Sequence, residues 1–399
     1  MPTIDSLNGV ETANIDEING IGKANIDGVN GNNEVGAPVA SRWLIGAASG
    51  LMYSTTAANA GSGWAELVDL GSNAYKTIAI GRDSDGEGGK KRWMLHASNN
   101  TNEIAYIDAD GDMTDSGNWT EVDYSTAYKA TDYGPHIVYG NGVWITGGFN
   151  VDDGDSQRTI MRSTDGGANW TSIDHDTGAS PQDVSQKTYA VAHKGGNSSL
   201  WIMSQGAQIF NSTDNGASWT HRKDLASITG VGGGNANREV RSIAYDGNGR
   251  WIAVLETNKI LTSDNDGVAW TLQTSGVSGT WSPTCVLYAN LASGGLWIVS
   301  HQNGRLQKSS DGETWTPIWN NTVGQPLDTD WDTSTIFSMA TDHHTIVICG
   351  SNGKIAHSAN GSNWTVLDPA IDGLTGTTYR AIACDVIAAG RGAAEGTSF

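Results

Sequence analysis

Aromatic and basic side chains recur at one kind of position in this sequence, where a loop leads into a short apolar segment. Aromatic faces and guanidinium groups are the groups that glycan and protein recognition uses, so the set predicts a ligand-binding face. The same Tyr and Trp side chains could instead pack under neighbouring units, and the sequence leaves both interpretations open. The candidate ligand-binding residues are Tyr75, Tyr133, His136, Arg238, Arg241, Trp281, Trp331, Tyr379 and Arg380.

Acidic clusters supply the oxygen atoms that Ca²⁺ prefers. Residues 108–112 (DADGD) form the strongest of four such clusters, and the others lie at 83–87, 152–155 and 328–332. None of them matches an EF-hand loop through both its Gly and its final Glu. We therefore expect solvated turns at these positions, with no metal site and no cofactor.

The composition favours a protein of many short strands and disfavours several functions. The 399 residues include 52 Gly, 16 Trp and only 8 Pro, which suits strands joined by glycine turns. A formal net charge of −20 repels phosphate backbones, so nucleic acid is not expected as a partner. No apolar run approaches the ~20 residues of a membrane helix, so we expect no membrane insertion. Cys285, Cys349 and Cys384 are few and far apart, which predicts small buried side chains.

The candidate residues belong to a repeating unit, which two tryptophan series reveal. The first series recurs at gaps of 45 to 55 residues and comprises Trp64, Trp119, Trp170, Trp219, Trp270, Trp315 and Trp364. The second opens short apolar runs and comprises Trp43, Trp93, Trp144, Trp201, Trp251 and Trp297, with residues 345–348 in the seventh place. One unit contains the expected strands 241–245, 250–255, 259–263 and 270–273. Four strands in every ~50 residues are typical of a propeller blade.

One turn sequence is shared by these units and is clearest at 163–170 (STDGGANW) and 212–219 (STDNGASW). We expect the Asp to accept hydrogen bonds from its own turn, the Gly to adopt positive φ and the Trp to open the fourth strand. The pattern resembles the Asp-box, or BNR repeat, S-x-D-x-G-x-x-W, with weaker copies at 115–119 and 59–64. The expected structural residues are Asp165, Gly167, Trp170, Asp214, Gly216, Trp219, Asn265, Gly267, Trp270, Asp311, Gly312, Trp315, Asn360, Gly361 and Trp364.

The ends of the chain predict how the ring closes. The first unit lacks an innermost strand before Trp43, and the segment 379–387 resembles an innermost strand without a blade of its own. Pairing of 379–387 beside 42–48 would leave no exposed sheet edge at the seam. The expected fold is therefore all-β, a single seven-bladed β-propeller over residues 39–399.

Asp-box propellers include the sialidases, and that resemblance implies specific catalytic residues. They are an Arg triad, an R-I-P or R-L-P motif, a Tyr nucleophile with a Glu partner and an Asp acid/base. This chain has no R-I-P or R-L-P, and only Arg241 and Arg380 begin innermost strands. We therefore expect no catalytic residues, and we expect Glu239 to form an ion pair with Arg241.

The first 38 residues follow a different rule, an 11-residue repeat seen in IDSLNGV, IDEINGI and IDGVNG. Asn-Gly in each copy favours short β segments with turns over a helix. Such units cannot bury an apolar face alone, so the arm is expected to anchor the protein to a partner. The expected anchoring residues are Ile4, Leu7, Val10, Ile15, Ile18, Ile21, Ile26 and Val29.

Strings of I-x-x-[IL]-N-G-V resemble the N-terminal segments of structural proteins of marine bacteriophages. The resemblance implies a non-enzymatic virion protein, a homo-oligomer in the particle whose arm binds other virion proteins. Its propeller would face outward, to stabilise the particle or to bind a host-surface glycan or protein. The N-terminus has no basic flank or apolar stretch, so no cleaved signal peptide is expected. Two alternatives stay open: a sialidase-like Asp-box glycoside hydrolase, and a cellular scaffold similar to photosystem assembly-factor propellers.

Overall fold

The fold is described from a computed structural model of the chain. The structure describes the backbone of residues 42–56, 62–71, 75–83, 89–97, 103–123, 136–147, 160–173, 188–232, 239–279, 281–318, 331, 334–367 and 378–385, with short paired segments between residues 6 and 22. Within these ranges the helices are the single 3₁₀ turns Ser116–Asn118, Leu225–Ser227 and Ser351–Gly353. No helix of the described residues is long and apolar enough to cross a membrane.

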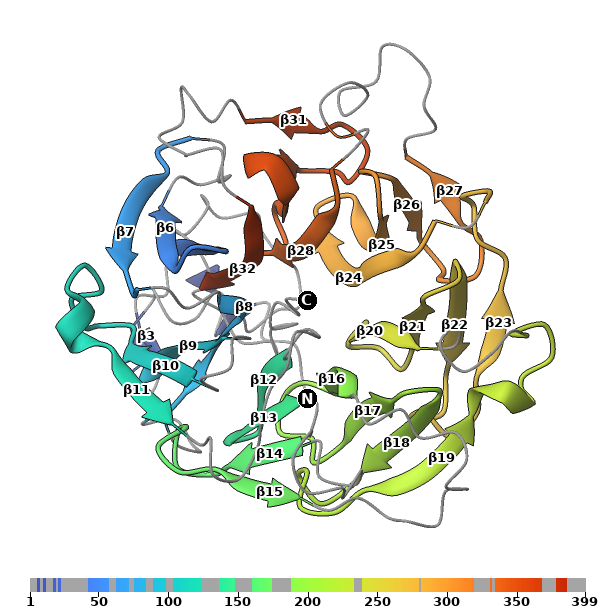
Figure 1. The fold of residues 1–399 in the computed structure, drawn as a ribbon, viewed down its shortest axis with the longest axis horizontal. Helices are drawn as coiled ribbons and strands as arrows, with labels where there is room; N and C mark the ends of the chain where they lie inside the picture. The colour runs from blue at the N-terminus through green and yellow to red at the C-terminus, as the bar shows by residue number, and fades with distance from the viewer. Residues whose placement is uncertain are drawn as a thin grey trace.

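Seven four-stranded antiparallel sheets surround a common axis (Figure 1). Blade 1 contains β32 (Tyr379–Asp385), β5 (Arg42–Ala47), β6 (Leu51–Thr55) and β7 (Ala65–Asp69). Blade 2 contains β8 (Tyr75–Arg82), β9 (Lys91–Ala97), β10 (Glu103–Asp108) and β11 (Thr120–Asp123). Blade 3 contains β12 (His136–Gly140), β13 (Val143–Gly147), β14 (Ile160–Ser163) and β15 (Thr171–Ile173). Blade 4 contains β16 (Thr188–His193), β17 (Trp201–Gln205), β18 (Gln208–Ser212) and β19 (Thr220–Asp224).

The remaining three blades repeat this order. Blade 5 contains β20 (Val240–Tyr245), β21 (Trp251–Leu255), β22 (Lys259–Ser263) and β23 (Thr271–Gln273). Blade 6 contains β24 (Pro283–Leu291), β25 (Gly294–His301), β26 (Leu306–Ser309) and β27 (Thr316–Pro317). Blade 7 contains β28 (Ile336–Thr341), β29 (Ile346–Gly350), β30 (Ile355–Ser358) and β31 (Thr365–Val366). The innermost strands β8, β12, β16, β20, β24, β28 and β32 lie nearest the axis (Figure 1), and the predicted seven-bladed propeller is confirmed.

The ring closes where the last strand meets the first blade. Strand β32 pairs antiparallel with β5, with Ile382 opposite Ile45 and Cys384 opposite Trp43. Ala48 N–H also donates to the Thr378 carbonyl over 2.9 Å. The predicted seam is therefore confirmed, and it gives blade 1 an innermost strand from the far end of the chain.

The N-terminal arm contains two short strand pairs. Strand β1 (Ser6–Leu7) pairs with β2 (Val10–Glu11), and β3 (Glu17–Ile18) pairs with β4 (Ile21–Gly22). Each pair encloses one Asn-Gly dipeptide, as expected of a two-residue hairpin turn. The predicted short β segments are confirmed here, whereas the Asn-Gly residues between them and Ile4, Ile15, Ile26 and Val29 lie outside the described residues.

Tryptophan side chains fill the interior of the blades. The inner series, Trp43, Trp93, Trp144, Trp201, Trp251 and Trp297, is at most 1% exposed. Second strands such as β17 and β21 are buried along their whole length, because both faces of a blade are covered by its neighbours. All three cysteines are buried, as predicted, and burial raises the pKa of Cys285 and Cys349.

The shared turn between the third and fourth strands is held by its own side chains. In blade 3, Ser163 Oγ donates to Asp165 Oδ1 over 2.8 Å and accepts from Gly167 N–H over 2.9 Å. Asp165 Oδ1 also accepts from Asn169 N–H, and Trp170 Nε1 donates to the Gly167 carbonyl. The copies at Asp214, Asn265, Asp311 and Asn360 repeat the bonds from serine to the acidic or amide side chain and from the glycine N–H to serine. Side chains of the turn thus replace water as partners of its backbone.

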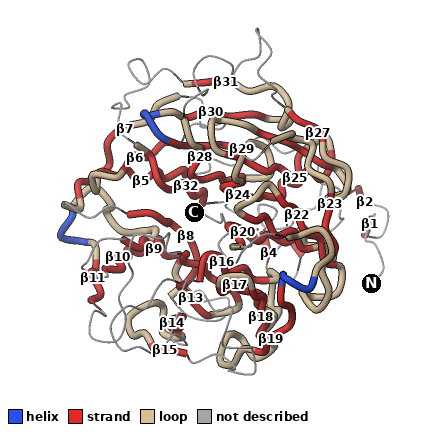
Figure 2. The backbone as a smooth tube through the Cα atoms, turned by 45° about the vertical axis from the view of Figure 1, so that its right-hand side comes forward, coloured by secondary structure: helices blue, strands red, loops and turns tan. Residues whose placement is uncertain are grey.

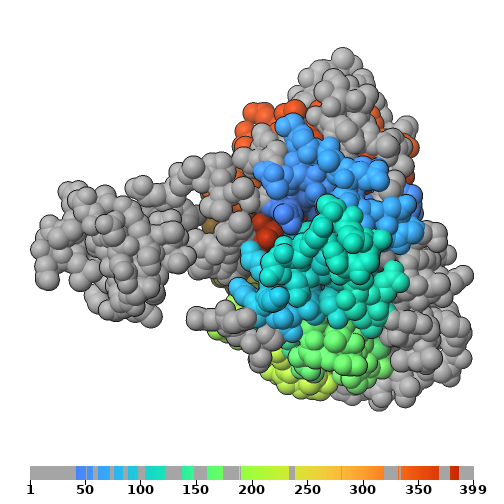
Figure 3. Space-filling view, turned by 90° about the vertical axis from the view of Figure 1, so that its left-hand side faces the viewer, coloured from blue at the N-terminus to red at the C-terminus, as the bar shows by residue number. Residues whose placement is uncertain are grey.

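Each of these turns packs on the preceding blade through its glycine. A Cβ atom on Gly216 would lie 2.3 Å from Ile145 Cδ1, and one on Gly267 would lie 2.7 Å from Ile202 Cδ1. The equivalent contacts join Gly167 to Met94, Gly312 to Ile252 and Gly361 to Leu296 and Ile298. Successive blades therefore lie against one another in chain order around the ring (Figure 3).

Basic side chains reinforce the same interfaces. Arg92 donates to the Gly166 carbonyl over 2.6 Å, and Arg162 donates to the Asn215 carbonyl over 2.9 Å. Lys194 binds the Asp266 carboxylate over 2.8 Å, and Arg250 binds the Asp311 carbonyl. Each cation extends from one blade to the turn of the next, where it satisfies a carbonyl or carboxylate beside the packed glycine.

Replacement of Gly216 by Ala tests the glycine contact. Gly216 has φ +77° and faces Ile145, whereas Gly247 has φ +76° with open space around it. We expect Gly216→Ala to destabilise the protein by roughly 2–4 kcal/mol, because backbone strain and a steric clash add. Gly247→Ala should cost only the strain, about 1–2 kcal/mol. Guanidinium unfolding midpoints measure both, and equal losses would show that the interface has room for a methyl group.

Candidate functional site

Two faces of the propeller are named by the ends of the innermost strands. The loop face is the end at which loops from the preceding blade lead into β8, β12, β16, β20, β24, β28 and β32. The turn face is the opposite end, which also carries the turns between third and fourth strands. The tube in Figure 2 follows these strands around the axis. Of the candidate ligand-binding residues that the structure describes, Arg241, Tyr379 and Arg380 lie near the starts of β20 and β32, and Trp281 lies shortly before β24, all at the loop-face end.

A β-bulge lies near the start of six of the seven innermost strands, as far as the described residues show. The bulged positions are Lys76, Tyr189, Arg241, Thr284, Phe337 and Arg380. A bulge re-aims the side chain of its extra residue. Arg241, Phe337 and Arg380 are half-buried, whereas the residues on both sides of each are fully buried. The bulges thus direct these side chains outward at the loop face.

Arg380 and Phe337, two of the bulged residues at the loop face, stack on each other. The Arg380 guanidinium carbon lies 4.2 Å from the centroid of the Phe337 ring. Burial lowers the pKa of Arg380 from its ordinary value. A guanidinium stacked on an aromatic ring keeps its edge N–H groups available, so this pair can bind a planar anion or a ring hydroxyl.

Arg241 instead belongs to an ion-pair cluster. Its guanidinium contacts Glu256, and one of its terminal nitrogens lies 3.8 Å from a Glu239 carboxylate oxygen. Ser282 Oγ donates to the other Glu256 oxygen over 3.1 Å. The predicted pairing of Glu239 with Arg241 is confirmed. The two carboxylates and one guanidinium form a compact group with a net negative charge at the loop face.

Trp281 is half-buried and is fixed from two sides. The Arg305 guanidinium carbon lies 4.2 Å from its ring centroid, and the Trp281 carbonyl bonds the His301 Nδ1 atom over 3.1 Å. His301 Nε2 lies 2.7 Å from Gln307 Nε2, and Gln307 in turn bonds Ser275. Burial lowers the pKa of His301 to about 4, so the imidazole is neutral at pH 7. A neutral buried network therefore positions the Trp281 loop.

A polar groove of about 340 Å³ lies beside Trp281. It is lined by Asn258, Lys259, Gln273, Ser275 and Gly279 among others. The Asn258 amide donates to the carbonyls of Val277 and Gly279 over 2.7 and 3.0 Å, which holds the loop before Trp281. An amide-rich groove next to an aromatic ring is suited to hydroxyl-bearing ligands.

The structure corrects two of the predicted ligand-binding residues. Trp331 is fully buried in the core between blades 6 and 7, close to Gly304 and Gly350. Tyr379 is also fully buried, and its ring lies edge-on to Tyr53 at 5.8 Å. Both predictions of a ligand contact are wrong, because the neighbouring blade covers these rings and they serve packing instead.

The other predicted residues divide into two groups. Arg241, Trp281 and Arg380 are half-buried at the loop face, where they were expected. Tyr133, Arg238 and the side chains of Tyr75 and His136 lie outside the described residues. Sequence reasoning missed Thr284, Phe337 and Asn258; the first two occupy the same bulge position as Arg241 and Arg380, so alignment of the innermost strands by register would have found them.

The strongest acidic cluster makes internal contacts. Asp108 accepts from Arg92 Nε over 2.8 Å, and Asp112 Oδ1 accepts from the Thr114 N–H and hydroxyl. Those bonds lower the pKa of Asp112, the hydroxyl bond first and the N–H bond second. Across the part of the chain that the structure describes, no group of three or more His, Cys, Asp or Glu is arranged to hold a metal ion.

No family model and no curated protein sequence matches this chain. Solved structures match it at low identity. A putative 6-phosphogluconolactonase from Bacteroides fragilis has a TM-score of 0.55 at 9% identity, over 88% of this chain and 99% of that one. A GH74 xyloglucanase from Xanthomonas campestris has a TM-score of 0.51 at 15% identity, over 74% of this chain and 45% of that one. YCF48 from Cyanidioschyzon merolae has a TM-score of 0.49 at 15% identity, over 75% and 87%.

At these identities the similarity shows the fold alone. The chain is a seven-bladed β-propeller, and the structures similar to it include a xyloglucanase and a putative 6-phosphogluconolactonase. Its function is therefore argued from its own residues.

The buried His301 predicts a pH-dependent stability. Its pKa falls from 6.5 to about 4 on folding, so between these values the unfolded chain binds a proton that the folded protein does not. Stability should fall by roughly 3 kcal/mol as pH decreases from 6.5 to 4, in addition to the effect of other groups. The variant His301→Asn, which does not titrate there, should show a loss smaller by that amount. Unfolding midpoints of wild type and His301→Asn at pH 7, 5.5 and 4 measure the two losses of stability. Parallel pH profiles of the two proteins would contradict the prediction.

Proposed function

We propose that this protein is a non-enzymatic structural protein of a bacteriophage particle, which displays a ligand-binding propeller. The N-terminal arm anchors it to other virion proteins, and the loop face is directed outward to bind a host-surface glycan or protein. The turns between third and fourth strands are Asp boxes in this proposal, because the Ser hydroxyl, the Asp or Asn side chain, the Gly backbone and the Trp indole make the bonds expected of the motif.

The observation that carries the binding role is the ring of bulged residues at the loop face. A bulge interrupts the ladder of an innermost strand, and such a defect recurs at the same position in six blades. Stacked Arg380 and Phe337, and Trp281 under Arg305, give this face aromatic platforms with guanidinium groups. Recognition sites are rich in these side chains.

The arm supports the anchoring role. Its two hairpins place Leu7 opposite Val10 and Ile18 opposite Ile21, an apolar pair in each hairpin. A two-stranded hairpin is at best marginally stable by itself in water, so these pairs need a partner surface. In the particle the protein is a homo-oligomer, and repeated copies let weak contacts at the loop face act together.

A glycoside hydrolase is the second candidate function, and one cluster favours it. Glu239 and Glu256 converge on Arg241 beside the Trp281 loop. Glycosidases commonly use two carboxylates, one as acid and one as base or nucleophile. Both carboxylates here face the same guanidinium, which makes an ion-pair network the simpler account.

Deletion of residues 1–36 tests anchoring. We expect the shortened protein to remain a folded propeller, because the seam and all seven blades lie beyond the arm. It should no longer join the parent particle in a complementation assay, while the full chain does. Circular dichroism and a thermal melt check folding. Incorporation of the shortened chain at the level of the full chain would refute the anchoring role.

Alanine variants of Trp281 and Arg380 test the loop face on a glycan array. We expect each to weaken binding of the bound glycan by about tenfold or more, because an aromatic platform or a half-buried guanidinium is lost. Asp110→Asn is the control, since Asp110 is exposed on the turn face of blade 2. Equal glycan signals from wild type and the three variants would show that Trp281 and Arg380 do not bind the glycan. Release of sugar from a bound glycan, lost in Glu256→Gln, would instead identify a hydrolase.

A further inference from the structure

Four neighbouring blades carry an aromatic or imidazole ring at the same place on the turn face. Each ring comes from the innermost strand and lies opposite the tryptophan that opens the second strand. The pairs are Tyr139 with Trp144, His193 with Trp201, Tyr245 with Trp251 and Tyr288 with Trp297. Their ring centroids are 4.5 to 5.0 Å apart. The four rings form an arc over blades 3 to 6.

Each ring is approached by a residue of the preceding blade. This residue directly follows the position in the innermost strand that is equivalent to the ring. In blade 2 this residue is Gly81, and a Cβ atom there would lie 2.3 Å from Tyr139. In blade 3 it is Gly140, and a Cβ atom there would lie 2.2 Å from His193. Backbone therefore covers the first two rings of the arc directly.

A lysine covers the third ring. Lys194 of blade 4 is equivalent to Gly81 and Gly140, and its Nζ atom lies 6.0 Å from the Tyr245 ring centroid. The same ammonium group binds both oxygens of Asp266 over 2.8 and 3.0 Å. An ammonium group is thus held between an aromatic face and a carboxylate, as in a cation–π site.

At the fourth ring, Tyr288, the equivalent residue is not a lysine. The equivalent residue in blade 5 is Asp246, and it lines a cavity of about 460 Å³ together with Tyr288, Asp264 and Asp311. The negative charge of Asp246 helps to raise the pKa of Tyr288, although burial of the phenol contributes more. Where blade 4 supplies a lysine, blade 5 supplies a carboxylate and leaves a cavity.

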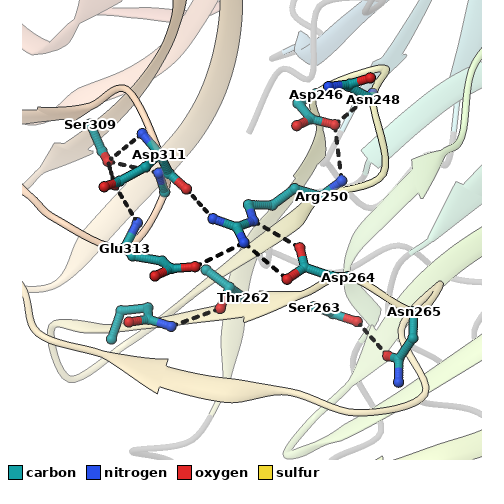
Figure 4. A network of polar contacts seen from close by, with 12 residues as sticks. Asp246, Asn248, Arg250, Thr262, Ser263, Asp264, Asn265, Ser309, Asp311 and Glu313 are labelled. Atoms are coloured by element: carbon teal, nitrogen blue, oxygen red, sulfur yellow. Dashed lines mark hydrogen bonds and ion pairs between the residues drawn. The ribbon is translucent and has the colours of Figure 1, made fainter.

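The cavity carries an excess of negative charge (Figure 4). Its one cation, among the residues described around it, is Arg250, which binds Asp264 through two bonds of 2.8 and 2.9 Å and Glu313 over 2.8 Å. Asp246 Oδ1 accepts from the N–H groups of Asn248 and Arg250 over 2.7 and 3.0 Å. These bonds fix the Asp246 carboxylate at the rim of the cavity, and they engage only one of its two oxygens.

We propose that this cavity between blades 5 and 6 is a binding site for an alkylammonium group, such as a lysine side chain of a partner protein or a free polyamine. The ammonium group binds the Asp246 carboxylate and lies over the Tyr288 ring, as Lys194 binds Asp266 over Tyr245 one blade earlier. The alkyl chain lies in the cavity. The site is on the turn face, opposite the loop face, and does not depend on the function proposed above.

The test uses the full chain and small probes. Binding of Nα-acetyl-lysine methylamide and of 1,5-diaminopentane is measured by NMR titration, with Nα-acetyl-norleucine methylamide as the uncharged control. We expect saturable binding of both amines, weaker at high salt, and none of the norleucine compound. Tighter binding of the lysine derivative would identify a protein lysine as the natural ligand, and tighter binding of the diamine would identify a free polyamine.

Matched variants locate the site. Asp246→Asn and Tyr288→Leu should each weaken amine binding by at least about fivefold, because the ion pair or the aromatic face is lost. Tyr288→Phe should bind within about twofold of wild type, since the ring remains. Asp246→Lys should abolish binding while the protein stays folded, because it places an internal lysine where blade 4 has Lys194.

Asp110→Asn controls for net charge, because it removes one exposed carboxylate from blade 2. It should bind amines as wild type does. The proposal is overturned if Asp246→Asn, Asp246→Lys and Asp110→Asn all bind like wild type, or if wild type binds the norleucine compound as well as the lysine derivative. Absence of saturable amine binding by folded wild-type protein would also overturn it.

Discussion

The contact between the turn glycine of one blade and the apolar side chain after the inner tryptophan of the preceding blade joins five pairs of neighbouring blades among the described residues, from blades 2 and 3 to blades 6 and 7. Gly216 on Ile145 and Gly267 on Ile202 leave no space for a Cβ atom. The serine and the acidic or amide side chain of each turn fix its backbone so that the glycine faces its neighbour. Strands within a blade are joined by ladders of hydrogen bonds, whereas neighbouring blades are joined by this packing, by shared hydrophobic clusters and by cations that reach the next turn.

The innermost strands begin at the other end of the molecule. There the bulges of β20 and β32 shift the strand register, while the four strands of each blade stay paired. Arg241 and Arg380 are directed outward by such bulges.

The same repeat also permits differences between interfaces. Gly140, Lys194 and Asp246 occupy equivalent positions in successive blades. The Gly140 backbone covers the His193 ring, and the Lys194 ammonium group covers the Tyr245 ring. Asp246 instead lines a cavity beside the Tyr288 ring. A change at one position of one blade leaves the ladders of the others intact. A propeller can therefore acquire a site at a single interface while the ring as a whole is preserved.

The sequence by itself determined the seven blades, their strands and the seam, because tryptophan spacing and turn residues are local signals with one consistent solution. It also determined that Asp, Gly and Trp of the turns would be structural, and that Glu239 would pair with Arg241. Only the tertiary structure decided which aromatic rings face solvent. Trp281 and Trp331 each precede an innermost strand in the sequence, yet Trp331 is fully buried while Trp281 is half-buried under Arg305. Exposure depends on what the adjacent blade places over a side chain, and residues far away in the chain supply that cover.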